Sequence, residues 1–270
     1  HWMVHSFPTR RSSDLPALLR AGRFDRKIYV DLPGLEERTK LFDYYLKKVK
    51  YNSDEVNSHK LAGVTSGWSP ADIANLTREG ALITVRNKKE IMGIKEIDEA
   101  RERIELGLKR RIKLSPEENK ATAYHEAGHA IAGHFFAPWI EQYKLSIIPR
   151  KRTLGVSWAN LKGETESLNK NQILGLIKRS LGGYVAEKLK CPSTTNGVTT
   201  DFEHALKNAY SMVWAYGMGT SGYIGNFYSL MEKTQQSIIS EEMKAKLDKD
   251  VQEIMHQCLK ETEEIGRAHV

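Results

Sequence analysis

The chain has 270 residues, of which 40% are hydrophobic and 28% charged, a composition typical of a globular protein with one large or two medium-sized domains. It contains no run of eighteen apolar residues that could cross a membrane, and its two cysteines, Cys191 and Cys258, are too few for a disulfide framework or a cysteine-based zinc site. The net charge of +7 does not indicate nucleic-acid binding, because the basic runs at 109–111 and 150–152 are short, scattered and free of interleaved aromatic residues.

The residues at the two ends of the chain are predicted to be foreign to the natural protein. Residues 11–14, Arg-Ser-Ser-Asp, can be encoded by CGC TCT TCC GAT, and the reverse complement of these codons encodes Ile-Gly-Arg-Ala, which is found at 265–268. Complementary codes at both ends indicate a sequencing-library adapter translated in frame. We therefore expect residues 1–15 and 265–270 to be disordered or arbitrarily packed, and the chain to be a fragment of a longer protein.

The first predicted elements form a small helical unit over residues 34–108. Residues 25–32 are rich in β-formers and predict a strand before it. One helix is predicted to begin at Ser69, the N-cap, with Pro70 in its first position and Asp72 completing a capping box. Two more helices are predicted by apolar stripes at Leu35, Leu41, Phe42, Leu46 and Val49, and at Ile97, Ala100, Ile104 and Leu108.

A second unit follows the basic linker KRRIKLSPEE. Ser115, Pro116 and Glu118 repeat the capping pattern and predict the start of a long helix, which we expect to be ended by Gly133 and Pro138. Its remaining elements are predicted to be a β-hairpin over 143–161 and helices at about 168–189, 200–216 and 240–262.

The long helix carries the chemistry in the stretch AYHEAGHAIAGHF. His125 and His129 lie four residues apart and therefore on one face of the helix, with Glu126 beside them. Two imidazoles so placed can hold Zn²⁺, and the glutamate can take a proton from a water that the metal activates. The alternative, two buried histidines in an ordinary helix, is disfavoured because the H-E-x-x-H pattern rarely arises by chance.

The third metal ligand is not evident from spacing. An extended metzincin motif would need Gly at position 132 and His at 135, where this chain has Ala132 and Phe135. A carboxylate on a later helix is then required. The candidates are Glu164, Glu166, Glu187 and Asp201.

Taken together, ATAYHEAGHAIAG, LSIIPRKRTLGVS, LGGYVAEKL and TNGVTTDFEHA resemble the protease domain of the FtsH family, membrane-anchored AAA+ zinc proteases. Upstream, PALLRAGRFDRKIYVDLPG resembles the end of that family's ATPase module, and SGWSPADIANLTREGAL its helical lid. The resemblance covers residues 16–262 and implies a mainly α protein. Its parts would be the end of an AAA+ core at 16–33, a helical AAA+ lid at 34–108, and a mostly helical zinc-metalloprotease domain with a small β-sheet at 109–264.

The resemblance also assigns roles in the protease domain. It makes Asp201 the third zinc ligand, in the first turn of a helix capped by Thr199 or Thr200, where the helix dipole favours a carboxylate. It makes Glu187 a carboxylate that orients a ligand imidazole, although on sequence alone Glu187 could equally be a solvent-facing helix residue. The strand LSIIP resembles the edge on which an extended substrate would pair.

Other residues match the family's nucleotide machinery. Arg20 and Arg23 correspond to its arginine fingers, which reach the γ-phosphate of a neighbouring subunit's ATP, although alone they would be read as surface arginines. Gly67, Ser69 and Ala71 fall where the lid approaches the nucleotide. The chain contains neither a G-x-x-x-x-G-K-[ST] loop nor a Walker-B acidic pair on a strand. The phosphate-binding core is therefore absent from it.

The resemblance implies an ATP-dependent zinc endopeptidase that degrades unfolded or membrane-associated proteins and uses Zn²⁺ and, in the full-length protein, ATP with Mg²⁺. It further implies a hexamer anchored by N-terminal membrane helices, with the catalytic part in the cytoplasm or its organellar equivalent. Two departures are Ala21 in place of a proline and Tyr184 in place of an arginine. The alternatives are a stand-alone zinc endopeptidase and a non-catalytic assembly subunit.

Overall fold

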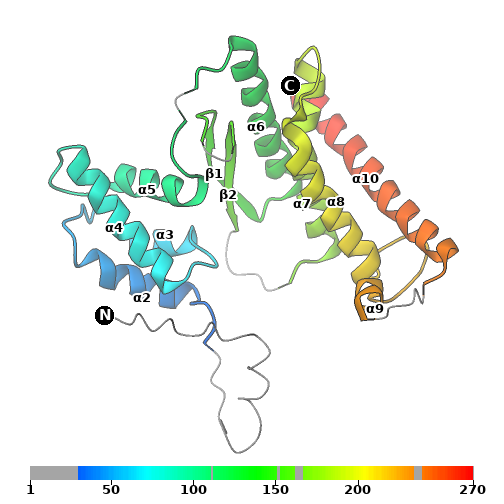
Figure 1. Ribbon diagram of the computed structural model, residues 1–270, viewed down its shortest axis with the longest axis horizontal. Helices are drawn as coiled ribbons and strands as arrows, with labels where there is room; N and C mark the ends of the chain where they lie inside the picture. The colour runs from blue at the N-terminus through cyan, green and yellow to red at the C-terminus, as the bar shows by residue number, and fades with distance from the viewer. Residues whose placement is uncertain (1–29, 111, 151–152, 162–166, 234–238, 270) are drawn as a thin grey trace, which may run out of the picture. The chain divides into compact units, whose positions relative to one another are not determined.

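The computed structural model describes residues 30–110, 112–150, 153–161, 167–233 and 239–269 (Figure 1). Residues 30–32 form no strand, so the described part of the strand predicted at 25–32 is not observed. Among the described residues, none of the helices combines the length and the apolar character needed to cross a bilayer. The candidate arginine fingers Arg20 and Arg23, the departure at Ala21, and the candidate ligands Glu164 and Glu166 lie outside the described residues.

Four helices build the first hydrophobic core: α2 (Leu35–Leu46), α3 (Ser58–Gly63), α4 (Pro70–Arg86) and α5 (Ile94–Leu106). The apolar stripes predicted for α2 and α5 do supply this core, but Leu108 lies beyond the end of α5 and is exposed. The short helix α3 was not predicted. The buried side chains of this core include Phe42, Leu46, Leu61, Ile73, Leu76, Ile83, Met92 and Ile97.

The predicted caps determine where two helices begin. The Ser69 hydroxyl accepts a hydrogen bond from the Asp72 amide, and the Asp72 carboxylate accepts one from the Ser69 amide at 2.9 Å. Ser115 and Glu118 exchange the same pair of bonds at the start of α6 (Pro116–Phe136). Each box satisfies amides that a helix N-terminus leaves unpaired. The predicted end of α6 at Gly133 is wrong, because the helix continues through this residue to Phe136.

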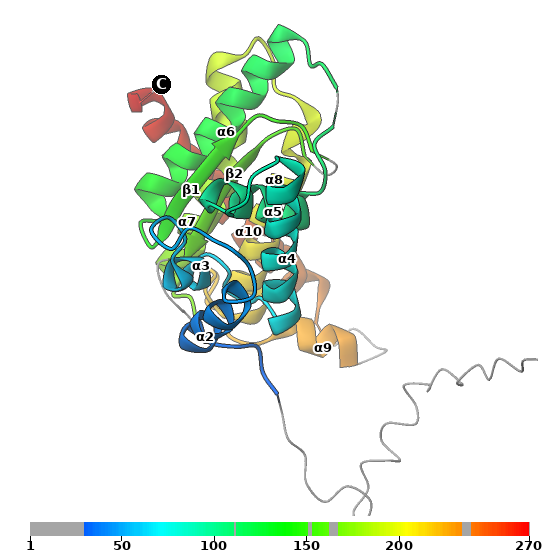
Figure 2. The same cartoon turned by 90° about the vertical axis from the view of Figure 1, so that its left-hand side faces the viewer.

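The second unit combines α6 with a two-stranded antiparallel hairpin and further helices. Strand β1 (Ile140–Ser146) pairs with β2 (Val156–Leu161), with a bulge between Gln142 and Lys144, and the hairpin lies beside α6 (Figures 1 and 2). The predicted hairpin is thereby confirmed. The remaining helices are α7 (Lys170–Lys190), α8 (Thr199–Tyr210), which continues as a π-helical turn over Ser211–Ala215, α9 (Phe227–Lys233) and α10 (Glu241–His269).

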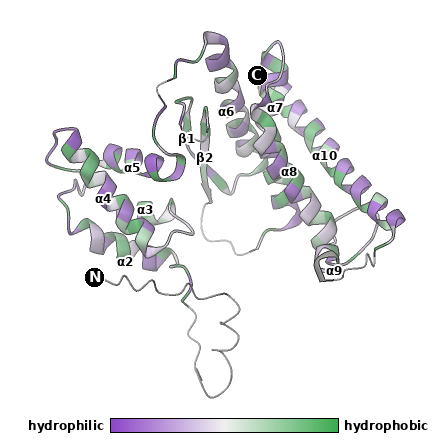
Figure 3. Ribbon diagram, in the orientation of Figure 1, coloured by the Kyte–Doolittle hydropathy of each residue, from purple (hydrophilic) through white to green (hydrophobic). Residues whose placement is uncertain are grey.

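Helices α7, α8 and α10 pack on one another around a second hydrophobic core. Figure 3 shows hydrophilic and hydrophobic residues alternating along α10, as expected for a helix with one face turned to a core. The contributing side chains include Ile173, Ile177, Leu181, Ala205, Ala209, Met212, Leu247 and Val251.

The hairpin is also tied to α5. The buried Glu102 forms ion pairs with Lys144 on β1 and with Arg150 in the hairpin loop. The guanidinium of Arg101 lies over the ring of Trp158 on β2, 4.6 Å from its centroid. Charge pairing and cation–π contact therefore join α5 to both strands.

The C-terminal end differs from expectation. We expected residues 265–270 to be disordered or arbitrarily packed, but α10 continues to His269 and Gly266 is buried, where a Cβ would meet Leu189 and Val185 of α7. The adapter origin of these residues stays a prediction. Residues 1–15 lie outside the described residues.

A buried carboxylate joins α10 to the loop before α9. Asp250 accepts hydrogen bonds from the amides of Thr220 and Ser221 at 3.0 and 2.9 Å, and from their hydroxyls at 2.9 and 2.6 Å. Burial alone would raise the pKa of Asp250, but the bonds from Ser221 and Thr220 outweigh it and hold that pKa below its usual range. The ionised form of Asp250 therefore stabilises the fold.

We predict that Asp250→Asn lowers the free energy of unfolding by roughly 2–3 kcal/mol at pH 7, because an amide nitrogen then faces hydrogen-bond donors. A carboxyl whose pKa is lower in the folded than in the unfolded state stabilises above the unfolded pKa, and this stability is lost as the pH falls through the folded pKa. Urea denaturation should therefore show a difference between wild type and variant that shrinks below about pH 4. The exposed Asp248→Asn is the control, and equal midpoints for Asp250→Asn and wild type at pH 7 would contradict the assignment.

Candidate metal centre

Three side chains from two helices converge on one point. His125 and His129 of α6 bring their Nε2 atoms within 3.0 Å of each other. The Oδ2 atom of Asp201 on α8 lies 3.1 Å from the first and 3.3 Å from the second. A tetrahedral zinc ion with bonds of about 2.0–2.1 Å needs ligand atoms about 3.3 Å apart, so the spacing of these three atoms would suit such an ion.

The hydrogen bonds behind the two imidazoles determine their tautomers. Nδ1 of His125 lies 2.7 Å from Oε1 of Glu187, and Nδ1 of His129 lies 2.8 Å from the carbonyl oxygen of Arg179. Both partners are acceptors, so each Nδ1 carries a proton, and in the neutral form of each imidazole Nε2 presents its lone pair to the convergence point.

Glu187 and Asp201 differ in what surrounds them. Glu187 is buried, and besides His125 it accepts hydrogen bonds from the amide and hydroxyl of Thr195 at 2.6 and 3.3 Å. Both carboxylate oxygens of Glu187 are therefore engaged in hydrogen bonds, and Glu187 contacts the Nδ1 side of the His125 imidazole, away from the point where the Nε2 atoms meet. In the described part of the chain, His125, His129 and Asp201 form the group of ligand-type residues close enough to share an ion.

The position of Asp201 follows from a short turn before α8. Residues Asn196–Val198 form a 3₁₀ turn, α8 begins at Thr199, and Asp201 falls in its first turn, where the helix dipole favours an anion. The predicted cap by Thr199 or Thr200 is wrong, because Val198 is the N-cap and the Thr199 hydroxyl donates to the Asn196 carbonyl. Burial would raise the pKa of Asp201, but hydrogen bonds that the imidazoles of His125 and His129 donate from Nε2 when they are protonated hold that pKa below its usual range.

Glu126 lies beside the ligands and against the hairpin. Its carboxyl is buried, and burial raises its pKa, partly opposed by the charges of His129 and His125. A Cβ placed on Gly155, just before β2, would lie 2.6 Å from Glu126 Oε1. The carboxylate is thus confined between α6 and the beginning of β2.

Two further features concern the resemblance: the residues of the lid that it places near the nucleotide, and the tyrosine that replaces a family arginine. Gly67, Ser69 and Ala71 lie together at the beginning of α4, with Gly67 in the left-handed region at φ +76°. Tyr184, in place of the family arginine, packs its ring on that of Phe202, next to Asp201, with centroids 5.1 Å apart.

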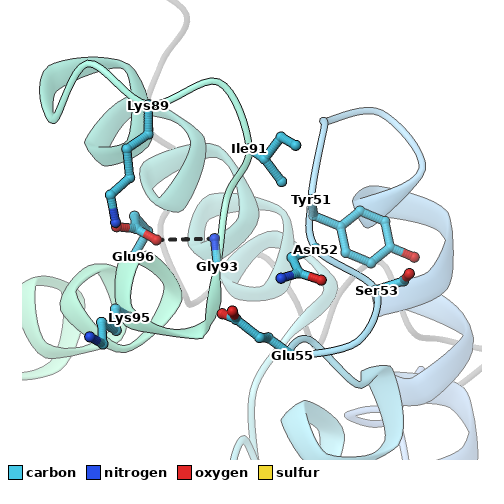
Figure 4. A pocket seen from close by; sticks show the side chains of 9 residues that line it. All are labelled: Tyr51, Asn52, Ser53, Glu55, Lys89, Ile91, Gly93, Lys95 and Glu96. Atoms are coloured by element: carbon cyan, nitrogen blue, oxygen red, sulfur yellow. Dashed lines mark hydrogen bonds and ion pairs between the residues drawn. The ribbon is translucent and has the colours of Figure 1, made fainter.

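An open hollow of about 550 Å³ lies in the helical unit (Figure 4). Its buried carboxylate, Glu96, already accepts a hydrogen bond from the Gly93 amide at 3.0 Å and pairs with Lys89 at 2.7 Å. The hollow carries no group comparable to the convergence of histidines and carboxylates on α6 and α8. It is lined by Tyr51, Asn52, Ser53, Glu55, Lys89, Ile91, Gly93, Lys95 and Glu96.

Known proteins resemble this chain over most of its length. Residues 112–269 match the profile of peptidase family M41. The ATP-dependent zinc metalloprotease FtsH of Borreliella burgdorferi is 37% identical over 94% of the chain and 41% of its own length, and that of Halothermothrix orenii 34% over 93% and 41%. FtsH 3 of Phytoplasma mali is 39% identical over 76% of the chain and 34% of its own length. The chain spans about two fifths of the length of the first two relatives.

We predict that His125→Ala, His129→Ala and Asp201→Asn each weaken zinc binding by more than about 100-fold, since a tetrahedral catalytic site has only three protein ligands. Glu126→Gln should retain one zinc per chain. Metal analysis after dialysis measures the content, with the exposed His134→Ala on the same helix as control. Normal zinc affinity in Asp201→Asn would show that the third ligand is misassigned.

We also predict that Glu187→Gln retains zinc with an affinity about 10–100-fold lower, because the neutral amide polarises the His125 imidazole less. Competition with a chromophoric chelator measures this change. Glu264→Gln, at an exposed position of α10, is the matched control. If Glu187→Gln bound zinc with wild-type affinity, Glu187 would have no role in supporting the metal ligand His125.

Proposed function

The chain belongs to peptidase family M41, and on this premise we propose that it is the proteolytic part of an ATP-dependent zinc endopeptidase that cleaves polypeptides. The observation that carries the proposal is the convergence of His125 Nε2, His129 Nε2 and Asp201 Oδ2 within 3.3 Å, with Glu126 beside them. Two neutral imidazoles and a carboxylate are the ligand chemistry of catalytic zinc.

Each residue then has a distinct task in peptide hydrolysis. Bound zinc would lower the pKa of a water molecule and polarise the scissile carbonyl group. Glu126 accepts the proton of the attacking water and delivers it to the leaving amine, a task helped by burial, which raises the pKa of its carboxyl above the usual range. Glu187 and the Arg179 carbonyl hold the imidazoles in the tautomer that the ion requires.

The hairpin supplies the surface for an extended substrate. Strand β2 pairs with β1 along one edge, and in the sheet of the described residues no third strand pairs along the other. An unpaired strand edge can bind an extended peptide by main-chain hydrogen bonds. The resemblance places the substrate on residues 145–149, of which only Leu145 and Ser146 lie in a strand, at the end of β1. Since β2 begins against Glu126, we propose instead that the substrate lies along β2 of this hairpin, beside the catalytic carboxylate.

The geometry counts against the alternative of a non-catalytic assembly subunit. Such a subunit has no chemical reason to bury Glu126 beside two imidazoles or to bring Asp201 within 3.3 Å of both. Buried ionisable groups without a function reduce stability. An intact set of four groups favours a catalytic chain.

For the whole protein we further propose a hexamer whose ATPase unfolds and threads substrates, with ATP and Mg²⁺ bound outside this chain. Arg20 and Arg23 would act as arginine fingers on a neighbouring subunit, and Gly67, Ser69 and Ala71 would face its nucleotide. Membrane helices would precede the chain and keep the protease in the cytoplasm or its organellar equivalent. The relatives named above support the ATP dependence, since their names describe ATP-dependent zinc metalloproteases.

We predict that the purified, zinc-loaded chain cleaves loosely folded casein slowly and that ATP does not change the rate, because the chain has no P-loop. Glu126→Gln should lower the rate by about 10²–10⁴-fold, the usual contribution of a general base. Release of labelled peptides measures the rate, with His134→Ala as control. Zinc-independent cleavage, or full activity in Glu126→Gln, would overturn the proposed function.

A further inference from the structure

Arg179 of α7 contacts both the metal centre and the hairpin. Its carbonyl oxygen lies 2.8 Å from Nδ1 of His129, and its Nη2 donates to the carbonyl oxygen of Ser157 on β2 at 3.0 Å. The main chain of one residue thus holds a metal ligand while its side chain holds a strand. Neither the H-E-x-x-H pattern nor any motif of the sequence points to this arginine.

The strand that Arg179 holds is the one beside the general base. Gly155, two residues before Ser157, leaves room for the Glu126 carboxylate where a Cβ would come within 2.6 Å. Ser157 is also held from β1, because its hydroxyl donates to Gln142 Oε1 at 3.1 Å. With its carbonyl bound from α7 and its hydroxyl from β1, Ser157 anchors the beginning of β2.

The Arg179 side chain passes Gly133 of α6 on its way to the hairpin. A Cβ on Gly133 of α6 would lie 3.4 Å from Arg179 Cδ and 2.6 Å from Gln142 Nε2. The absence of a side chain at Gly133 therefore leaves room for the Gln142 amide, whose oxygen binds Ser157, while the stem of Arg179 packs against Gly133 at ordinary contact distance. Its Nε atom is buried without a hydrogen-bond partner among the described residues, so the side chain is held there at a cost.

The charge of Arg179 also suits this position. Three carboxylates, those of Glu126, Glu187 and Asp201, surround the two imidazoles. The charge of the Arg179 guanidinium acts on Asp201 and Glu126, and together with a zinc ion held by the three ligands it would balance the three negative charges. Buried charges are tolerated when they are compensated in this way.

We propose that Arg179 is a positioning residue that couples the metal centre to the substrate-binding strand. This proposal rests on the proposed function, because the proposed function assigns β2 to the binding of the substrate. Arg179 fixes β2 at Ser157 relative to the helix turn that orients His129, so that a peptide paired with the strand meets the metal and Glu126 in register. A planar guanidinium is suited to this task because it can bind a carbonyl while its stem stays packed.

The test compares Arg179→Met, which keeps an apolar stem, with Arg179→Lys, which keeps the charge. Lys178→Met is the matched control, since it removes the neighbouring cation, which pairs with Glu261 on α10. Amide hydrogen exchange over Val156–Ala159, zinc affinity by chelator competition, and the KM and kcat of a fluorogenic peptide are measured on the zinc-loaded chain. The exchange and zinc measurements do not depend on activity.

In Arg179→Met we expect exchange in β2 about 10–100-fold faster, the effect of losing one charge-assisted hydrogen bond. The kcat/KM should fall by a similar factor, with a raised KM, while zinc affinity stays within about threefold because the residue 179 carbonyl remains. Arg179→Lys should recover part of both losses, and Lys178→Met should show neither. Unchanged exchange in β2, or zinc loss in parallel with activity, would overturn the coupling. If the wild type shows no zinc-dependent cleavage, the proposed function fails, while the exchange measurement still decides whether Arg179 holds β2.

Discussion

Gly128 on α6 and Gly182 on α7 face each other so closely that a Cβ on either residue would collide with the carbonyl group of the other. A third glycine, Gly183, lies against the imidazole of His125, where a Cβ would come within 2.6 Å of the ring. Only this close approach lets the main chain of α7 reach His129 and the Glu187 carboxylate reach His125. The chemistry of α6 therefore depends on the small residues of its neighbour.

The close packing of α7 on α6 also positions the other parts of the site. Helix α7 carries the groups that hold both imidazoles and, through Arg179, the beginning of β2. The 3₁₀ turn after α7 is bound to Glu187 through Thr195, and it leads directly into α8 with Asp201 in its first turn. One carboxylate of α7 thus positions a ligand of α6 and the chain segment that delivers the third ligand.

Local sequence rules predict much of this protein. Capping boxes at Ser69 and Ser115, the hairpin and the position of the histidines on α6 follow from interactions between residues close in the chain. The choice between Glu187 and Asp201 does not, because both are carboxylates on later helices and only tertiary packing decides which one meets the two Nε2 atoms. Arg179 escaped notice for the same reason: on a helix a lone arginine looks like a surface residue until the strand that it binds is known. Gly133 misled the prediction of a helix end, since its role is to give space to neighbouring side chains rather than to break α6.

Anomalous scattering of a zinc-loaded crystal at the zinc absorption edge tests the metal centre most directly. We predict one strong peak between α6 and α8, bonded to His125 Nε2, His129 Nε2 and an Asp201 oxygen at about 2.0–2.2 Å, with a fourth position free of protein atoms. A peak bonded to Glu187 in place of Asp201, or a zinc ion bound away from the two histidines, would contradict this prediction.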